Sequence, residues 1–465
     1  MRTATKQRLI GHTGSLAGKC IAVKDNIVTT SRPTTAASKV LSGFISPFDA
    51  TVVKLLQDAG ASVESKSNLD EFGMGSHSQT SFPTPVQSPF SRGGLPLSPG
   101  GSSGGSAVAV ATGEAWAALG TDTGGSVRLP AAYCGVVGFK PSYGLLSRWG
   151  VIQYANSLDT VGVLAGNVED TGKVFKALNT YDSNDPTSLA DQARQRIASQ
   201  TSPKSTGLKI GIPQEYNIEE LTAPVREAWN LTLSRLQRAG HTLVPVSLPT
   251  TRQALSAYYV LAPAEASSNL AKYDGVRYGQ RTPGSDAVPK EDFPLYARTR
   301  GEGFGEEVRR RILLGAYALS SEAIDNYFIQ AQKVRRLVQQ DFDRVFAAKN
   351  PLHDTPESHA NEGVDFLLAP TAPSLPPTLA DLEQQTTVEG YMLDVFTVPA
   401  SLAGLPALSV PVPIQDSVRK NMDAGDVKTV GMQIIGQYGS DEGVLGVGRI
   451  IEDLCTESPH APKHQ

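Results

Sequence analysis

Glycines and serines gather in the stretch Gly120-Thr-Asp-Thr-Gly-Gly-Ser126, whose residue types suit nucleophilic chemistry. Two consecutive glycines before a serine let successive backbone N–H groups point toward one spot, and such a nest binds an anion. An oxyanion formed during acyl transfer is one such anion. The hydroxyl of Ser126 would then be the attacking group, although the same residues are also compatible with a plain glycine turn.

A serine hydroxyl needs a base before it can attack, and this stretch contains no histidine. Lys24 is the candidate base, because it follows the apolar run Ile21-Ala-Val23, which is typical of a buried strand. Burial disfavours the charged ammonium and lowers the pKa of a lysine, so a buried Lys24 could accept a proton. The alternative is a surface lysine at a strand end, which is the usual situation of a lone lysine.

A second stretch, Pro99-Gly-Gly-Ser-Ser-Gly-Gly-Ser106, has the composition of a flexible linker. The small apolar residues of Ala107–Gly113 follow at once, however, and their size favours a tightly buried segment. A P-loop is excluded because no Gly-Lys-Ser/Thr follows. Ser103 matches the nucleophile-elbow pattern, but the prolines in Gly94–Gly100 argue against the strand that this motif requires.

The composition is that of a globular protein and argues against several functional classes. Of the 465 residues, 40% are hydrophobic and 19% are charged, which is sufficient for a large buried core. With a net charge of −4, the chain lacks the excess of basic residues that is typical of a protein that binds nucleic acid by itself. The three cysteines and seven histidines form neither a disulfide framework nor a zinc motif, and no apolar run is long enough to cross a membrane.

Alternating helix and strand patterns predict an α/β fold with a mostly parallel sheet. A helix capped by Asp49 and stopped by Gly60 precedes a strand at 61–64, and a helix capped by Thr222 precedes a strand at 242–248. Further predicted elements are long helices within 300–346 and strands at 209–212, 366–369, 407–412 and 430–435.

The chain shows no internal repeat, and residues 16–465 are predicted to form one domain with polar insertions near 182–206, 350–363 and 416–428. Residues 1–15 form a separate basic segment that is rich in threonine and contains no acidic residue. That composition is typical of an organelle-targeting segment, and equally of an ordinary basic tail.

Together these residues resemble the amidase signature family, over nearly the whole chain from Leu16 onward. The stretches Gly100–Ser106 and Gly120–Pro130 and the lysine of Ala22-Val-Lys-Asp-Asn26 carry the likeness. The resemblance implies the amidase signature fold, in which helices cover both faces of a large mixed, mostly parallel β-sheet.

The resemblance also assigns a role to each residue of the expected active site. It implies a triad in which Ser126 is the nucleophile, Ser102 a bridging cis serine and Lys24 the base, with Ser103 as a loop residue. The spacing between Ser102 and Ser126 matches the family's motif. The oxyanion hole would consist of the backbone N–H groups of Thr123, Gly124, Gly125 and Ser126.

Within the family, the likeness is greatest to the A subunits of mitochondrial glutamyl-tRNA(Gln) amidotransferases. It implies that Arg311 holds the α-carboxylate of glutamine and Asp394 its α-amino group, with Tyr258 or Tyr259 lining the same pocket. An arginine fork suits a carboxylate, and an aspartate suits an ammonium. A solvated helix face is the alternative for the arginines at 309–311. The narrower likeness is carried by Ala264–Leu270, Tyr273–Gly279, Glu306–Ile312 and Ala318–Ser321.

This subgroup implies an enzyme that hydrolyses glutamine and delivers ammonia to a partner, the B subunit of the amidotransferase. The partner would bind ATP and Mg²⁺ and convert Glu-tRNA(Gln) to Gln-tRNA(Gln), and a small third protein would complete the complex. No cofactor or metal is expected on this chain. The alternatives are a stand-alone amidase that hydrolyses a small or fatty amide, and a non-catalytic assembly factor of the complex.

The N-terminus departs from the family pattern, because only 15 residues precede Leu16 where family members carry a helical region. That layer would be absent or supplied by a partner. Mitochondrial members can be shortened in this way. The basic start and the likeness together predict a location in the mitochondrial matrix, without insertion into a membrane.

Overall fold

The computed structural model describes residues 14–199, 206–284, 295–352 and 363–456. Strands of this part form one large sheet in the order β2-β1-β5-β7-β6-β11-β12-β10-β8-β9, and β3 (Ser91–Arg92) pairs with β4 (Leu95–Pro96) in a separate hairpin. The strands of the large sheet are β1 (Cys20–Lys24), β2 (Ser62–Ser67), β5 (Ala117–Asp122), β6 (Val137–Lys140), β7 (Thr160–Ala165), β8 (Lys209–Pro213), β9 (Thr242–Val246), β10 (Phe366–Pro370), β11 (Ala407–Pro413) and β12 (Thr429–Gly436).

The sheet is mixed, as the predicted fold class requires, but it is not mostly parallel, because five of the nine pairs between its described strands are antiparallel. Its two edges are parallel: β1 lies between β2 and β5, and β8 lies between β10 and β9. The strand pairs between β5 and β10 are antiparallel. Because β1 and β5 run in the same direction, their carboxyl ends meet, and Lys24 at the end of β1 comes to lie beside the stretch Gly120–Ser126.

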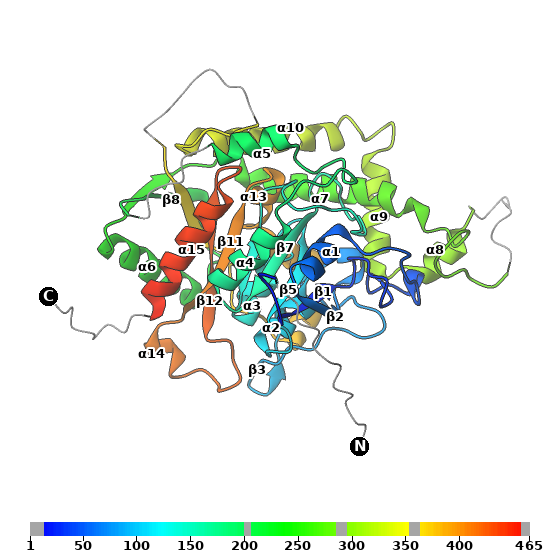
Figure 1. Cartoon of the computed structure of the whole chain (residues 1–465), viewed down its shortest axis with the longest axis horizontal. Helices are drawn as coiled ribbons and strands as arrows, with labels where there is room; N and C mark the ends of the chain where they lie inside the picture. Colours follow the sequence, from blue (N-terminus) through cyan, green and yellow to red (C-terminus); the bar gives the residue numbers. More distant parts are fainter. Residues whose placement is uncertain (1–13, 200–205, 285–294, 353–362, 457–465) are drawn as a thin grey trace.

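Helices cover both faces of the sheet (Figure 1). On one face lie α4 (Val168–Leu178) and α15 (Asp441–Thr456), and on the other lie α2 (Gly104–Ala111) and α3 (Arg128–Cys134). Side chains of a strand alternate between the two faces. Accordingly, Ala117 and Leu119 of β5 belong to the core beneath α4 and α15, whereas Ala118 packs with α2 and α3.

The second glycine- and serine-rich stretch leads directly into a buried helix and is not a linker. Ser102, Ser103 and Ser106 are buried, and so are Ala107 and Val110 of α2. The small size of these side chains lets α2 lie close to the sheet, as the composition of Ala107–Gly113 predicted.

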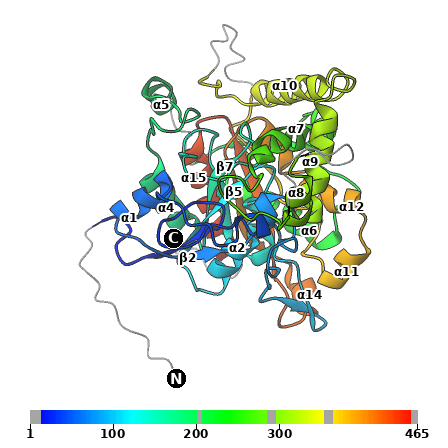
Figure 2. The same cartoon turned by 90° about the vertical axis from the view of Figure 1, so that its right-hand side faces the viewer.

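A further group of helices supplies the side chains expected to bind substrate. The helices α9 (Glu306–Ala318) and α10 (Phe328–Val345) both pack against α7 (Thr251–Asn269) (Figure 2). The contact between α7 and α9 is close, because a Cβ at Gly315 would lie 1.9 Å from the carbonyl oxygen of Pro263. The other α-helices are α1 (Thr51–Asp58), α5 (Asp191–Ala198), α6 (Ala223–Arg238), α8 (Ala297–Gly303), α11 (Leu379–Gln384), α12 (Thr387–Tyr391), α13 (Val398–Leu402) and α14 (Asp416–Arg419).

The predicted elements are present with shifts of a few residues. Of the two predicted helix caps, Asp49 is wrong, whereas Thr222 does occupy the N-cap position of α6. The N-cap residue of α1 is Ala50, and the carboxylate of Asp49 instead accepts the backbone N–H of Thr30 at 2.6 Å. The hydroxyl of Thr222 makes no capping bond and donates to the carbonyl of Pro373 at 3.4 Å. Both side chains found partners in other segments, which the local sequence pattern does not reveal.

Several predicted segments lie outside the described residues. They are residues 1–13 of the basic segment, 200–205 of the connection at 182–206 and 353–362 of the insertion at 350–363. The rest of the connection contains α5, which buries no residue, and the insertion at 416–428 contains α14. Among the described helices, none has the length and apolar character needed to span a bilayer.

Candidate active site

Lys24 ends β1 and is completely buried, as the preceding apolar strand predicted. Its Nζ lies 2.8 Å from the Oγ of Ser102, 2.8 Å from the Oγ of Ser103, and 3.2 Å from the carbonyl oxygen of Thr121. A neutral amine has two N–H donors and one lone pair. The oxygens of Ser103 and Thr121 can accept the two donors, which leaves the lone pair for the hydroxyl proton of Ser102.

The charge state of Lys24 follows from its surroundings. Burial lowers its pKa to about 7, and the carboxylates of Asp70, Asp122 and Asp159 oppose this shift. A group with this pKa is half neutral near pH 7 and largely neutral at pH 8. Lys24 therefore has the proton affinity that a general base needs at a mitochondrial or cytosolic pH.

Ser102 lies in a tight loop before α2. The peptide bond between Gly101 and Ser102 is cis, and the resemblance implied a cis serine at this position. A side chain at position 101 has no room, because its Cβ would lie 2.2 Å from a carboxylate oxygen of Asp70. Ser103, expected to be a loop residue, is the N-cap residue of α2 and contacts Lys24 at the same distance as Ser102 does.

Ser126 lies in the loop between β5 and α3, and this loop is joined to the one that carries Ser102. The carbonyl of Ser126 accepts the N–H of Ser103 at 3.1 Å. Within the described part of the chain, the N–H groups of Gly124, Gly125 and Ser126 have no acceptor. These donors are available to an anion beside the Ser126 hydroxyl, which is the arrangement that an oxyanion hole requires.

Side chains packed behind this loop explain why it contains two glycines. A Cβ at Gly124 would lie 2.7 Å from the ring of Tyr258, and a Cβ at Gly125 would lie 2.2 Å from the Oγ1 of Thr397. Gly125 also has a φ of +150°, and Thr397 donates a hydrogen bond of 2.6 Å to the carbonyl of Gly124. The backbone of the loop is therefore held in place by contacts that leave no space for a larger residue.

Gly125→Ala is expected to lower the turnover of amide substrate by about 10²-fold, because displacement of Thr397 would shift the N–H donors of the loop. Gly113→Ala is the matched control: Gly113 also has a positive φ, +75°, but no described atom lies within 4 Å of the added Cβ. Turnover rates of the two purified variants would be compared with those of the unmodified protein. Equal rates for Gly125→Ala and the control would contradict the role given to this loop.

A buried network anchors the same loop from the other side. Arg128 is inaccessible to solvent and forms an ion pair with Asp122 at 2.8 Å. Its guanidinium also donates to the carbonyl of Thr397 at 2.9 Å and to the side-chain oxygen of Gln433 at 2.7 Å. Because Thr397 contacts Gly124, Arg128 connects the end of β5 with the segment before α13.

Arg311, on α9, is buried and held by three neighbours. Its Nη1 donates to the hydroxyl of Tyr154 at 2.6 Å, and its Nε donates to Glu307 at 2.8 Å. The hydroxyl of Tyr391 donates to the same oxygen of Glu307 at 3.0 Å. Arg309 is exposed by contrast, so burial singles out Arg311 and disfavours the solvated-face alternative for that residue.

Asp394 lies close to this arginine. Its Oδ2 accepts hydrogen bonds from the hydroxyls of Ser76, at 3.0 Å, and of Tyr259, at 3.2 Å, while the guanidinium of Arg311 lies over the ring of Tyr259. Burial raises the pKa of Asp394 to about 6, although the bond from Ser76 lowers it. Asp394 is therefore largely ionised at pH 7. Tyr258 packs against Gly124, and it is Tyr259 that touches Asp394.

A pocket of about 460 Å³ lies beside Arg311, and Asp394, Ser102 and Ser126 are not among the residues that line it. Arg311, Tyr391 and Ser76 line it together with Asp70 and His77, whose neighbours include the backbone of Gly101. An arginine and a carboxylate at its wall suit a ligand that carries both an anionic and a cationic group.

The sequence had not singled out Tyr154, Ser76 or Glu307. A local signal existed for Glu307, because it precedes Arg311 by four residues on one helix, where opposite charges meet. No such signal exists for Tyr154, which lies 157 positions from Arg311.

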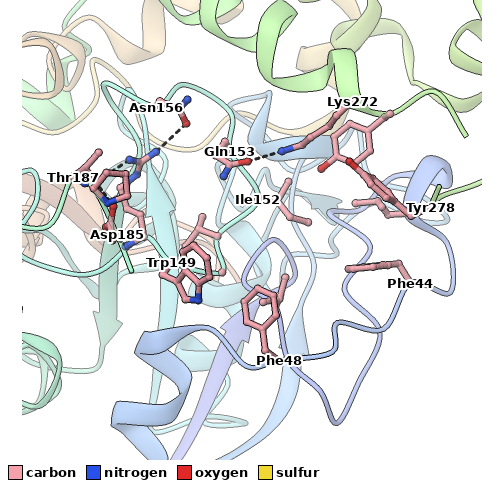
Figure 3. Close-up of a pocket in the computed structure, with 17 residues that line it drawn as sticks. Phe44, Phe48, Trp149, Ile152, Gln153, Asn156, Asp185, Thr187, Lys272 and Tyr278 are labelled. Carbon is pink, nitrogen blue, oxygen red and sulfur yellow. Dashed lines mark hydrogen bonds between the residues drawn. The ribbon is translucent and has the colours of Figure 1, made fainter. Parts of the chain in front are cut away.

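The pocket in Figure 3 has another position and another character. It holds about 570 Å³, and aromatic rings line it in two pairs, Phe48 with Trp149 and Phe44 with Tyr278. None of the predicted site residues, all of which are described, lines this pocket. The described residues also contain no cluster of three or more histidine, cysteine or acidic side chains that could hold a metal ion.

Comparison with known proteins identifies the family of this chain. The family model described as Amidase matches residues 2–445. The A subunit of the mitochondrial glutamyl-tRNA(Gln) amidotransferase of Ajellomyces capsulatus is 55% identical, over 98% of this chain and 93% of that protein. The protein of the same name from Coccidioides posadasii is 58% identical, over 95% and 89% of the two chains.

A solved structure shows the same likeness in three dimensions. The crystal structure of the glutamyl-tRNA(Gln) amidotransferase A subunit from Thermotoga maritima has a TM-score of 0.74 and 36% sequence identity, and the match covers 97% of this chain and 85% of that one. With a family model matched along most of its length and relatives more than half identical to it, the chain belongs to the amidase signature family.

Proposed function

We propose that this chain is the glutaminase component, known as the A subunit, of a mitochondrial glutamyl-tRNA(Gln) amidotransferase. The observation that carries the proposal is the 2.8 Å contact between the buried amine of Lys24 and the hydroxyl of Ser102. It is supported by a pocket lined by Arg311 and Ser76, whose hydroxyl donates to Asp394. The names of its relatives support the same subgroup and location. Glutamine has the α-carboxylate and α-ammonium that such a pocket would pair.

The first half of the reaction forms an acyl-enzyme. Neutral Lys24 takes the proton of Ser102 as Ser102 takes that of Ser126, and the Ser126 oxygen attacks the side-chain amide carbon of glutamine. The N–H groups of Thr123, Gly124, Gly125 and Ser126 would stabilise the resulting oxyanion, and loss of one such donor typically costs ~3 kcal/mol. The proton returns through Ser102 to the amide nitrogen, the C–N bond breaks, and ammonia leaves.

The second half regenerates the enzyme. A water molecule gives a proton to the same relay and attacks the acyl carbon, which frees glutamate and returns the hydroxyl of Ser126. Ammonia would pass to a partner, the B subunit, which carries ATP and Mg²⁺ and amidates Glu-tRNA(Gln). A small third protein would complete the assembly, in the mitochondrial matrix.

Arg311→Lys is expected to raise the KM for glutamine about 10- to 100-fold with a smaller effect on kcat. Lysine keeps the charge but cannot contact Tyr154, Glu307 and a substrate carboxylate in one planar arrangement, and a charged hydrogen bond contributes about 1.5–3 kcal/mol. Steady-state glutaminase kinetics would measure the change. Arg309→Lys, at an exposed position of the same helix, is the control and should keep the original KM.

Substrate preference separates this function from that of a stand-alone amidase. Rates would be measured with glutamine, acetamide and a long-chain fatty amide, for the chain alone and for the complex with its partners. Preference for glutamine is expected, because an apolar amide would leave the buried arginine and carboxylate without a charged partner. Faster hydrolysis of the fatty amide would favour the stand-alone enzyme, and no glutaminase activity in the complete complex would favour a non-catalytic assembly factor.

A further inference from the structure

Asp70 is a buried carboxylate that has no step in the mechanism above. It follows β2 and is only 1% exposed. One of its carboxylate oxygens accepts the backbone N–H of Ser78 at 2.8 Å, and the other accepts the hydroxyl of Thr80 at 2.9 Å. The carboxylate thereby holds the start of the loop of residues 70–80 against its end.

That loop in turn holds the backbone on both sides of Ser102. The hydroxyl of Ser78 donates to the carbonyl of Gly100 at 2.8 Å and accepts the N–H of Gly104 at 3.0 Å. The N–H of Asp70 donates to the carbonyl of Ser102 at 3.3 Å. A shift of Asp70 or Ser78 would therefore move the Ser102 hydroxyl relative to Lys24.

Asp70 also differs in its ion pairing from Asp122 and Asp159, the two other carboxylates that face Lys24. Asp122, at the end of β5, is paired with Arg128 at 2.8 Å, and Asp159, before β7, lies 4.0 Å from Arg148. Among the described residues, no arginine or lysine forms an ion pair with Asp70, and Lys24 is the cation that it faces.

His77 lines the same pocket as Asp70 and adds no positive charge near neutral pH, because burial lowers the pKa of its ring to about 4. Burial raises the pKa of Asp70, and the hydrogen bonds from Ser78 and Thr80 and the charge of Lys24 oppose that shift. In its ionised form Asp70 therefore directs its negative charge at the amine of Lys24.

We propose that Asp70 is a positioning residue that, through Ser78, keeps Ser102 at hydrogen-bond distance from Lys24 and presents a negative charge to the Lys24 amine. This inference rests on the proposed glutaminase function and assigns a role to a residue that has no step in the mechanism above.

The test compares Asp70→Asn with Ser78→Gly in the assembled complex. Both variants remove bonds to the loop, but only the first removes a charge, and glycine tolerates the φ of +55° at position 78. The measurement is kcat at saturating glutamine between pH 5.5 and 9. At saturation the profile reports groups of the enzyme–substrate complex.

Both variants are expected to lower kcat about 10- to 100-fold, because misplacement of a relay group is costly. For Asp70→Asn the acid limb of the profile should also move to lower pH, by about one unit. The direction follows from charge: without the carboxylate the ammonium form of Lys24 is less favoured, so the amine becomes neutral at a lower pH. For Ser78→Gly the acid limb should stay in place.

Asp49→Asn is the matched control, because Asp49 accepts a backbone N–H in a surface loop away from the site and should leave the profile unchanged. Amidation with ammonium chloride shows that each variant has folded and assembled. An unmoved acid limb for Asp70→Asn, or an unchanged kcat for Ser78→Gly, would overturn the proposal. An unmodified complex without glutaminase activity would instead contradict the proposed function, and the positioning role would fall with it.

Discussion

Replacing Ser126 with alanine is expected to abolish the glutamine-dependent formation of Gln-tRNA(Gln) by the assembled complex, while formation from ammonium chloride persists. The hydroxyl of Ser126 would be the group that forms the acyl-enzyme, and the neighbouring N–H groups alone cannot replace it. A loss of at least about a thousandfold is typical for a missing nucleophile. The measurement is the amount of Gln-tRNA(Gln) produced with each nitrogen donor.

The two donors distinguish a chemical defect from a structural one. Ammonium chloride supplies ammonia directly, so the partner's reaction no longer depends on this active site. Persistence of both activities would show that Ser126 is not the nucleophile, and loss of both would point to a failure of folding or assembly. Ser103→Ala is an informative comparison, because Ser103 also lies 2.8 Å from Lys24 but begins α2, and we expect it to retain more activity.

Lys24→Met is expected to reduce glutamine hydrolysis about 10²–10⁴-fold, the usual contribution of a general base. Methionine fills a similar volume in the buried site but has no lone pair that could take the proton of Ser102. Lys66→Met is the control: Lys66 is also largely buried, on the adjacent strand β2, but pairs with Asp25 at 3.3 Å and contacts neither serine. Activity of Lys24→Met close to that of Lys66→Met would contradict the assignment of the base.

The pH dependence of the unmodified enzyme provides a second check on Lys24. Because the neutral amine is the active form and burial lowers its pKa to about 7, kcat should rise between pH 6 and pH 8 with a midpoint near that value. Glutaminase assays at saturating glutamine would show the curve. A rate independent of pH across this range would mean that Lys24 does not limit the reaction as a base.

Much of the site could be predicted because its signals are local. Lys24 follows three apolar residues at the end of a strand, which buries it. Gly124 and Gly125 precede Ser126, and only glycine fits against Tyr258 and Thr397 in that loop. The small residues after Ser106 likewise indicate close packing, and the stretch leads into the buried helix α2, as they predict, and is not a linker. The family resemblance supplied the roles of Ser102, Arg311 and Asp394, which stay predictions until they are tested.

Other features had no local signal. Thr222 is the N-cap residue of its helix and Asp49 is not, but neither side chain makes a capping bond, because both bond to segments remote from the helices that they precede. Choosing between Tyr258 and Tyr259 required the direction of each side chain on α7, since adjacent residues of a helix point to different sides. Tyr258 packs against Gly124, and Tyr259 donates a hydrogen bond to Asp394.

Local sequence patterns are sufficient to indicate the kind of chemistry and the α/β fold, because side-chain types, the size of small residues and the alternation of apolar positions act over a few neighbouring residues. Which of these groups meet depends on the folded chain. Lys24 reaches Ser102 across 78 positions, and Ser76 reaches Asp394 across 318, since parallel pairing of β1 with β5 and the packing of helices on the sheet close these distances. Asp70 gained its position beside Lys24 in the same way, through contacts that exist only in the folded chain.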